Sequence, residues 1–270
     1  MRLRGSVVLL SVVTASLAVA QSRDTSEVET LTAPPAPLPE VRAEPAEVVD
    51  RVVRQTNELR RSEGLEELAT DDRLAEAAQR FADYMARTDR YGHQADGQRA
   101  AQRVREEGYD YCLVLENIGY GFDPDGYSSG ELTSTFFDGW KNSPGHRENM
   151  LDPAVTETVV AVARSDKTAH WYAVQLFGRP KSAAIEFRVE NDSEAEVSYT
   201  VGENAFDLPP RYAREHLRCR PVDLVFDLGG DDSAERTLEA EAGASYVISG
   251  EGQGGGLRVE ASAPEATRGD

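Results

Sequence analysis

Residues 140–151 read WKNSPGHRENML. The Ser-Pro-Gly step at 143–145 breaks the helix that we expect over 130–142, and a new helical turn is expected to begin near His146. The segment therefore places an imidazole at the start of a short helix, directly after a break in the backbone. A single histidine in such a place is weak evidence of function, so the segment has to be weighed with others.

Two earlier segments carry side chains of the same chemical kind. Residues 90–93 read RYGH, and His93 follows a predicted helix. Residues 116–121 read ENIGYG, and Glu116 follows the apolar run 113–115. A carboxylate in an apolar setting is either paired or has a raised pKa. The three segments together supply two imidazoles and one carboxylate.

Helical and strand patterns both surround these segments. Apolar residues recur at helical spacing in four stretches, namely 45–64, 71–85, 98–107 and 130–142. Alternation of side chains then predicts two strands, at 158–163 and 171–177. The predicted fold class of this region is α+β.

In order and context, the segments resemble the CAP superfamily of cysteine-rich secretory, antigen 5 and plant pathogenesis-related proteins, and most closely its bacterial secreted branch. The resemblance extends over residues 45–180. It also rests on Asn57-Glu58-Leu59-Arg60, on Asp72-Arg73-Leu74-Ala75-Glu76-Ala77-Ala78, on Arg103 through Gly108-Tyr109, and on Tyr172-Ala173-Val174-Gln175-Leu176-Phe177-Gly178. It implies an α-β-α sandwich, with helices on both sides of a small central sheet.

The resemblance also implies a surface cleft. Family members hold two histidines and two glutamates there, and some bind a divalent metal. Three of the four map onto His93, Glu116 and His146, whereas the position of the second glutamate, three residues after Trp140, is Ser143. We therefore expect a cleft formed by these three residues and Ser143, with the three as ligands for zinc or another divalent cation. The alternative is a hydrogen-bonded His–Glu–His cluster that binds nothing.

The pattern changes after residue 180. Short β-like runs separated by turns rich in Asn, Asp and Gly replace the helical periods, and they lie at 185–189, 197–201, 222–226, 246–249 and 257–259. Residues 181–270 are therefore predicted to form a small all-β, sandwich-like domain.

The N-terminus has the features of a secretory signal peptide. Two arginines precede an apolar run over residues 6–20, and the small-x-small pattern ending at Ala20 predicts cleavage there. The alternative, an uncleaved anchor, is disfavoured because the run is shorter than the roughly 20 residues that span a bilayer. Residues 21–44 are polar and contain four prolines, so we expect a disordered linker. The protein is predicted to be exported, secreted or periplasmic, with no transmembrane span after cleavage.

Charge and cysteine content indicate which partners are disfavoured and whether a disulfide is expected. Acidic residues outnumber basic ones 48 to 29, for a net charge of −19, and such a field disfavours nucleic acid as a partner. Outside the cytosol, the two cysteines, Cys112 and Cys219, are expected to form a disulfide. Two buried free thiols are the alternative.

Two functions of different kinds follow from these observations. The favoured one is an exported, non-enzymatic binding module whose cleft takes a divalent metal and a small or apolar ligand, with a lipid, glycan or protein of the cell envelope as partner. The other is a metal-dependent hydrolase of peptide or envelope material. No catalytic residue is assigned, because the chain lacks an H-E-x-x-H stretch. A third reading makes residues 45–180 a rigid spacer for the β-rich domain.

Overall fold

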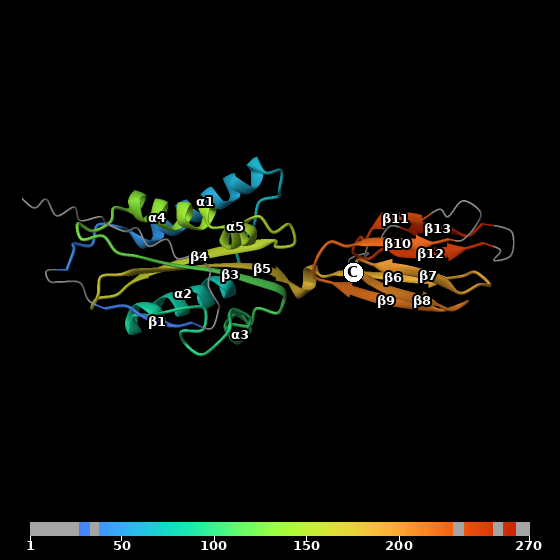
Figure 1. Ribbon diagram of the computed structural model, residues 1–270, viewed down its shortest axis with the longest axis horizontal. Coiled ribbons are helices and arrows are strands. Elements are labelled where there is room, and N and C mark those ends of the chain that lie inside the picture. Colours follow the sequence, from blue (N-terminus) through green and yellow to red (C-terminus); the bar gives the residue numbers. More distant parts are fainter. Residues whose placement is uncertain (1–26, 33–37, 229–234, 251–255, 263–270) are drawn as a thin grey trace, which may run out of the picture.

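The computed structural model describes residues 27–32, 38–228, 235–250 and 256–262. The predicted signal peptide, residues 1–20, lies outside these ranges. The described chain is elongated, with an α/β part at one end and an all-β part at the other (Figure 1).

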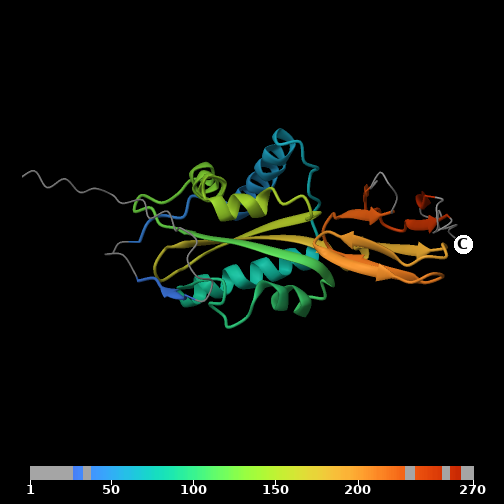
Figure 2. The same cartoon turned by 45° about the vertical axis from the view of Figure 1, so that its right-hand side comes forward.

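The α/β part is a three-layer sandwich. Its central sheet is antiparallel with strand order β3-β5-β4, formed by β3 (Tyr111–Gly121), β5 (Trp171–Pro180) and β4 (Glu157–Arg164). The helices on one face are α1 (Pro45–Ser62), α4 (Ser129–Asn142) and α5 (Pro144–Met150). On the other face lie α2 (Asp72–Thr88) and α3 (Ala100–Glu106) (Figures 1 and 2). The predicted α-β-α sandwich is confirmed.

An apolar core lies on each face of this sheet. Val52 of α1 and Trp140 of α4 belong to the first core, and Leu74 and Phe81 of α2 belong to the second. The middle strand, β5, is buried continuously over residues 171–178, because helices cover both of its faces. Each helical apolar stripe therefore faces the sheet, as its periodicity predicts.

The longest strand of the sheet, β3, is absent from the sequence-based expectation. Its residues 111–121 include only a short apolar run, and most of its side chains are half-buried. The reason is its position, since β3 is an edge strand with β5 on one side only. An edge strand does not need the strong alternation or the apolar run that identifies a buried one.

The prediction of a disordered linker over residues 21–44 is wrong for the parts of this range that the structure describes. Strand β1 (Glu29–Thr30) pairs antiparallel with β2 (Arg90–Tyr91). Further along, the guanidinium of Arg42 donates a hydrogen bond to the carbonyl of Gly126. Polar composition did not prevent this pairing, because Val28 and Leu31 on either side of β1 pack against the α2-side core.

The all-β part consists of two four-stranded sheets. One has the order β11-β10-β7-β8 and the other β13-β12-β6-β9. Their strands are β6 (Ile185–Asn191), β7 (Val197–Val201), β8 (Asn204–Leu208), β9 (Ala213–Arg218), β10 (Asp223–Asp227), β11 (Glu235–Glu239), β12 (Ser245–Ser249) and β13 (Arg258–Ser262). A shared core of buried aliphatic and aromatic side chains includes residues of both sheets. The three strands that the sequence did not predict, β8, β9 and β11, all lie at sheet edges, where one-sided exposure weakens the apolar pattern.

One buried histidine in this part predicts a pH-dependent stability. His216 is 7% exposed, and its Nε2 lies 2.8 Å from the hydroxyl of Tyr199. Burial, reinforced by the charges of Arg218 and Arg214, lowers the pKa of His216 to about 4. The unfolded chain takes up this proton near pH 6.5, whereas the folded chain does not. Stability is therefore complete above pH 6.5 and falls between pH 6.5 and 4, by up to about 3 kcal/mol.

Urea unfolding measured at pH 7 and at pH 4.5 checks this prediction. The matched variant is His216→Phe combined with Tyr199→Phe, which removes the titrating ring without leaving a hydroxyl unpaired. Its free energy of unfolding should fall less than that of the wild type over the same interval. Equal pH slopes in the two proteins would contradict the prediction.

A disulfide and an ion pair join the two parts. Cys112 of β3 is bonded to Cys219, which directly follows β9, with 5.3 Å between their Cα atoms. The predicted disulfide is confirmed. The next residue, Arg220, pairs with Asp152 at 2.6 Å, and the short 3-10 helix Lys181–Ala183 carries the chain between the two parts.

Candidate functional site

The predicted site residues His93 and Glu116 are in direct contact. His93 Nδ1 lies 2.7 Å from Glu116 Oε1. The other carboxylate oxygen, Oε2, accepts a hydrogen bond of 2.5 Å from Arg103. The Glu116 side chain is only 5% exposed. Both of its oxygens therefore have partners within the protein.

Arg103 is the residue that sequence reasoning missed. Its side chain is 1% exposed and pairs with Asp96 at 3.0 Å as well as with Glu116. It also donates to the backbone carbonyls of His93 and Gln98, and its guanidinium lies 3.6 Å from the ring centre of Phe81. The available signal was a basic residue beside the apolar Val104 in a short helix. That signal is weak, because no feature of the neighbouring sequence indicates that the arginine side chain is buried.

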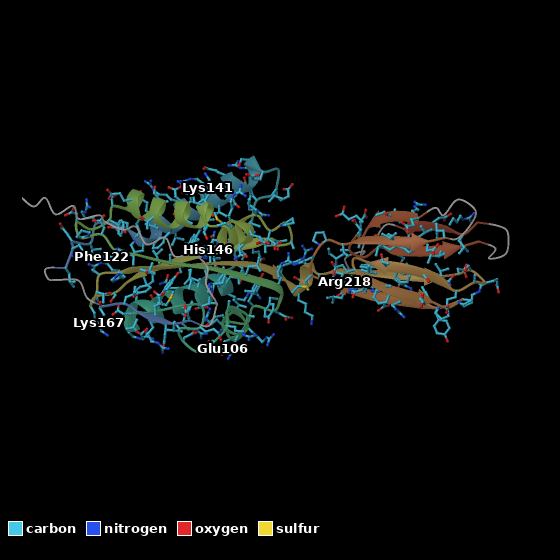
Figure 3. All side chains as sticks on the ribbon, viewed as in Figure 1. Glu106, Phe122, Lys141, His146, Lys167 and Arg218 are labelled. Atoms are coloured by element: carbon cyan, nitrogen blue, oxygen red, sulfur yellow. A yellow bond between two sulfur atoms is a disulfide. The ribbon has the colours of Figure 1, made fainter. Side chains whose placement is uncertain are left out.

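His146 approaches from the opposite layer. Figure 3 shows His146 on the α5 side of the sheet and Glu106 on the α3 side. The amide of Asn117 donates to the carbonyl of His146 at 3.1 Å, and Asn149 donates to the Asn117 side-chain oxygen at 2.9 Å. These bonds fix the first turn of α5 to β3. The structure thus brings His93 and Glu116 into contact, whereas His146 is held to Asn117 of β3 through its backbone carbonyl.

The His146 ring is half-buried. Burial, together with the charge of His93, lowers the pKa of His146 to about 4. His146 is therefore neutral at pH 7. The remaining predicted cleft residue, Ser143, is 6% exposed at the joint between α4 and α5, where its N–H bonds to the carbonyl of Trp140.

The three predicted ligands do not fit a three-ligand metal site as they are arranged. Glu116 has its two oxygens on His93 and Arg103, and the positive guanidinium opposes a second cation there. Within the described ranges, no three His, Cys, Asp or Glu side chains are grouped to hold a metal ion. Metal binding stays a prediction, and we derive no chemistry from it.

A cavity of about 350 Å³ lies beside His146. Its walls include five aromatic side chains, one carboxylate and several small residues. They are Tyr91, Ile118, Gly119, Tyr120, Tyr127, Ser134, Thr135, Phe136, Asp138, Gly139, Trp140, Asn142 and His146. The walls come from four separate segments of the chain, so no single motif predicts the cavity.

The free edge of β3 forms the floor of this cavity. The carbonyl of Ile118 accepts hydrogen bonds from Trp140 Nε1 at 3.0 Å and from the Tyr91 hydroxyl at 3.3 Å. A Cβ on Gly119 would lie 3.1 Å from the Phe136 ring, and one on Gly121 would lie 3.1 Å from the Tyr127 hydroxyl. The two glycines of the ENIGYG segment thus let aromatic rings lie across the strand.

Comparison with known proteins agrees with this architecture. The family model described as the cysteine-rich secretory protein family, CAP, matches residues 53–177. We refer to the α/β part of the chain, which contains these matched residues, as the CAP domain. No curated protein matches the chain. Within the described ranges, every helix is too short or too polar to cross a lipid bilayer.

Three solved structures are similar to about half of the chain. An outer surface protein from Borrelia burgdorferi is 22% identical with a TM-score of 0.42, and the match covers 49% of this chain and 92% of that one. An extracellular protein containing a SCP domain from Bacillus anthracis is 24% identical, with a TM-score of 0.41 and coverages of 50% and 41%. A cysteine-rich secretory protein from Staphylococcus aureus is 21% identical, with a TM-score of 0.39 and coverages of 50% and 39%. This chain thus spans about two fifths of the length of the last two.

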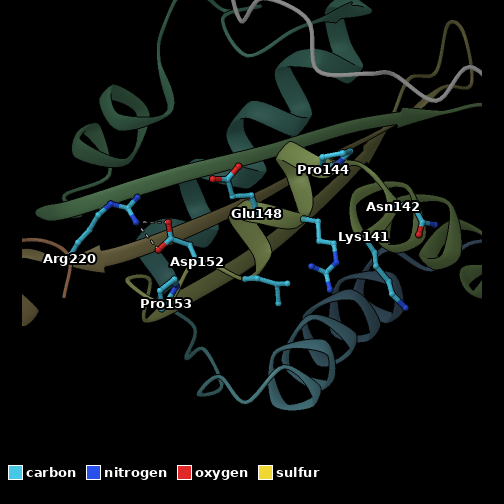
Figure 4. A pocket seen from close by; sticks show the side chains of 9 residues that line it. Lys141, Asn142, Pro144, Glu148, Asp152, Pro153 and Arg220 are labelled. Atoms are coloured by element: carbon cyan, nitrogen blue, oxygen red, sulfur yellow. Dashed lines mark hydrogen bonds and ion pairs between the residues drawn. The ribbon is translucent and has the colours of Figure 1, made fainter. Parts of the chain in front are cut away.

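A second hollow, of about 670 Å³, lies where the CAP domain meets the all-β part. Lys141, Arg147, Glu148 and Asp152 contribute from the CAP domain, and Arg220 contributes from beyond it. Figure 4 shows Arg220 reaching Asp152 across this hollow. Arg147 pairs with Glu63 in turn. Of the three basic side chains that line this hollow, Arg147 and Arg220 are therefore paired with carboxylates. The hollow has no concentration of charge of one sign.

Proposed function

We propose that this protein is an exported, non-enzymatic binding module whose CAP cleft takes a small ligand with apolar groups. The observation that carries the proposal is the aromatic cavity of about 350 Å³ at the free edge of β3. Ligand pockets are typically concave, largely apolar, and of about 300–1,000 Å³. Residues 1–20, with the pattern of a signal peptide, support export.

The chemistry next to the cavity favours binding over hydrolysis. A hydrolase needs a carboxylate or imidazole that is free to take a proton from water. Glu116 is held on both oxygens by His93 and Arg103. His146 lines the cavity, but it is a weak base because its pKa is lowered to about 4. The buried, hydrogen-bonded cluster instead ties the α2–α3 layer to β3, beside the cavity, and so gives the cleft a rigid wall.

Filling the cavity tests the proposal. Gly139 lines the cavity in the last turn of α4, and a Cβ there would meet no atom within 4 Å. Gly139→Leu should therefore occupy the cavity without strain, and it should strengthen the helix by up to about 1 kcal/mol. The probe is the neutral dye N-phenyl-1-naphthylamine, followed by fluorescence. We expect the variant to bind the dye at least tenfold more weakly than the wild type.

The same helix supplies a matched control. Gly130 of α4 also has open space around it and does not line the cavity, so Gly130→Leu should leave dye binding unchanged. If Gly139→Leu bound the dye as well as the wild type, the dye would be binding elsewhere and the proposal would fail. Thermal melting of both variants shows whether they remain folded.

A further inference from the structure

We infer that the ligand of this cavity is a cation surrounded by apolar groups, of the trimethylammonium or methylated-amine type. The inference rests on the proposed binding function and names the class of ligand. It is carried by three properties of the cavity, namely its aromatic walls, the sign of its charge and its size.

Five aromatic rings line the cavity. Tyr91 and Tyr120 meet edge to face with ring centres 4.6 Å apart. Phe136 and Trp140 of α4 stack with ring centres 5.9 Å apart, and Tyr127 is the fifth ring. The faces of aromatic rings attract cations, and sets of such rings recognise quaternary ammonium groups. A neutral apolar ligand would use the same walls, so charge has to decide between them.

Among the residues that line the cavity, the side chain that is charged at pH 7 is acidic. Among its thirteen lining residues there is one carboxylate, Asp138, and no lysine or arginine. The nearby Arg103 is buried and paired with Glu116 and Asp96. Lys141 of the same helix lines the other hollow, and its ammonium lies 5.8 Å from the ring centre of Phe137. An anionic ligand would therefore meet a carboxylate with no cation to balance it.

The size of the cavity favours a small group. A volume of about 350 Å³ lies near the lower end of the range for ligand pockets. It admits a trimethylammonium group with a short substituent, whereas a long acyl chain would have to extend beyond it. The net charge of the whole chain is −19, and this charge also raises the local concentration of cations.

Three small molecules of nearly the same shape but different charge separate the effect of charge on binding from the effect of shape. They are choline, the neutral 3,3-dimethylbutan-1-ol and the anionic 3,3-dimethylbutanoate, each titrated into the full chain and followed by protein-detected NMR. We expect choline to bind at least tenfold more tightly than the alcohol, and the carboxylate to bind most weakly. Sedimentation with phosphatidylcholine vesicles forms a further arm, since a lipid headgroup carries the same cation as free choline.

Two variants locate the effect. Asp138→Asn should weaken choline binding by about threefold to tenfold and leave binding of the alcohol unchanged, because it removes only the charge. Asp50→Asn is the matched control: Asp50 is exposed on α1 and does not line the cavity, so choline binding should be unchanged. Tyr127→Leu should weaken choline more than the alcohol, whereas Tyr127→Phe, which keeps the ring, should not.

The outcomes distinguish the two proposals. If the alcohol or the carboxylate bound as tightly as choline, the cation inference would be overturned while the apolar cleft stood. If none of the three probes and no dye bound, both proposals would be overturned. Vesicle binding that Asp138→Asn weakens would support the cation inference with a lipid as its source, and binding to free choline alone would support it with a soluble ligand.

Discussion

Replacing Arg103 by methionine is expected to destabilise the CAP domain by about 3–5 kcal/mol. The guanidinium is buried and neutralises Glu116, whose side chain is 5% exposed. Methionine has a similar length and keeps an apolar contact with Phe81, so packing changes little. The cost arises because the Glu116 carboxylate would be left in a low-dielectric site with a hydrogen bond to His93 as its main compensation.

A second substitution separates lost charge pairing from lost packing. Glu116→Gln in the Arg103→Met background removes the uncompensated charge, so the double variant should be more stable than Arg103→Met alone. Denaturant unfolding followed by tryptophan fluorescence measures this, since Trp140 and Trp171 both lie in the CAP domain. A loss below 1 kcal/mol in Arg103→Met would show that the buried pair contributes little. A double variant less stable than the single one would show that packing dominates.

Removing the disulfide by Cys112→Ala and Cys219→Ala is expected to cost about 4–5 kcal/mol in the chain-entropy account. The bridge closes a loop of 107 residues in sequence, and a loop of that length greatly restricts the unfolded chain. The loop contains nearly all of the CAP sheet, helices α4 and α5, and the first four strands of the all-β part. Both parts should therefore lose stability when the bridge is absent.

Two spectroscopic probes check this expectation. Tryptophan fluorescence reports on the CAP domain, and far-ultraviolet circular dichroism reports on the whole chain. In the double alanine variant, we expect the midpoint of each transition to fall and the two transitions to separate, because the covalent link between the parts is gone. The matched control is Arg220→Ala, which breaks only the ion pair with Asp152. That pair is half-exposed on the arginine side, so its loss should cost less than about 1 kcal/mol. An equal effect of both changes would contradict the prediction.

The CAP cleft of this chain combines a closed polar cluster with an open aromatic cavity. The cluster satisfies Glu116 with His93 and Arg103 and leaves no free carboxylate oxygen. The cavity beside it has a carboxylate at Asp138 and no lysine or arginine among its lining residues. We therefore place recognition in the aromatic cavity and structural support in the cluster. The variants of Asp138 and Arg103 test these roles separately, since the first should change binding and the second stability.

Local patterns predicted the helices well because each has one apolar face. The apolar spacing within α2 identifies that helix from sequence alone, and Asp71 supplies its N-cap by accepting from two backbone N–H groups. The missed strands of the three larger sheets, β3, β8, β9 and β11, are all edge strands, although the edge strands β4 and β13 were predicted. An edge strand has a partner on one side and a mixed environment, which weakens its apolar pattern. Strand β1, which lies in the expected linker, was not predicted either. Its partner β2 is about 60 residues away in sequence, so no local pattern indicates the pairing.

The sequence by itself predicted the class of fold, the helices and a disulfide between the two cysteines, and it named candidate site residues. It did so because amphipathic period, glycine and proline breaks, and residue type act locally. Only the tertiary structure decided what those side chains can do. The pairing of Arg103 with Glu116 and the aromatic cavity on the edge of β3 join segments far apart in sequence. Burial, charge pairing and cavity shape depend on which surfaces meet, and that is settled when the helices pack on the two faces of the sheet.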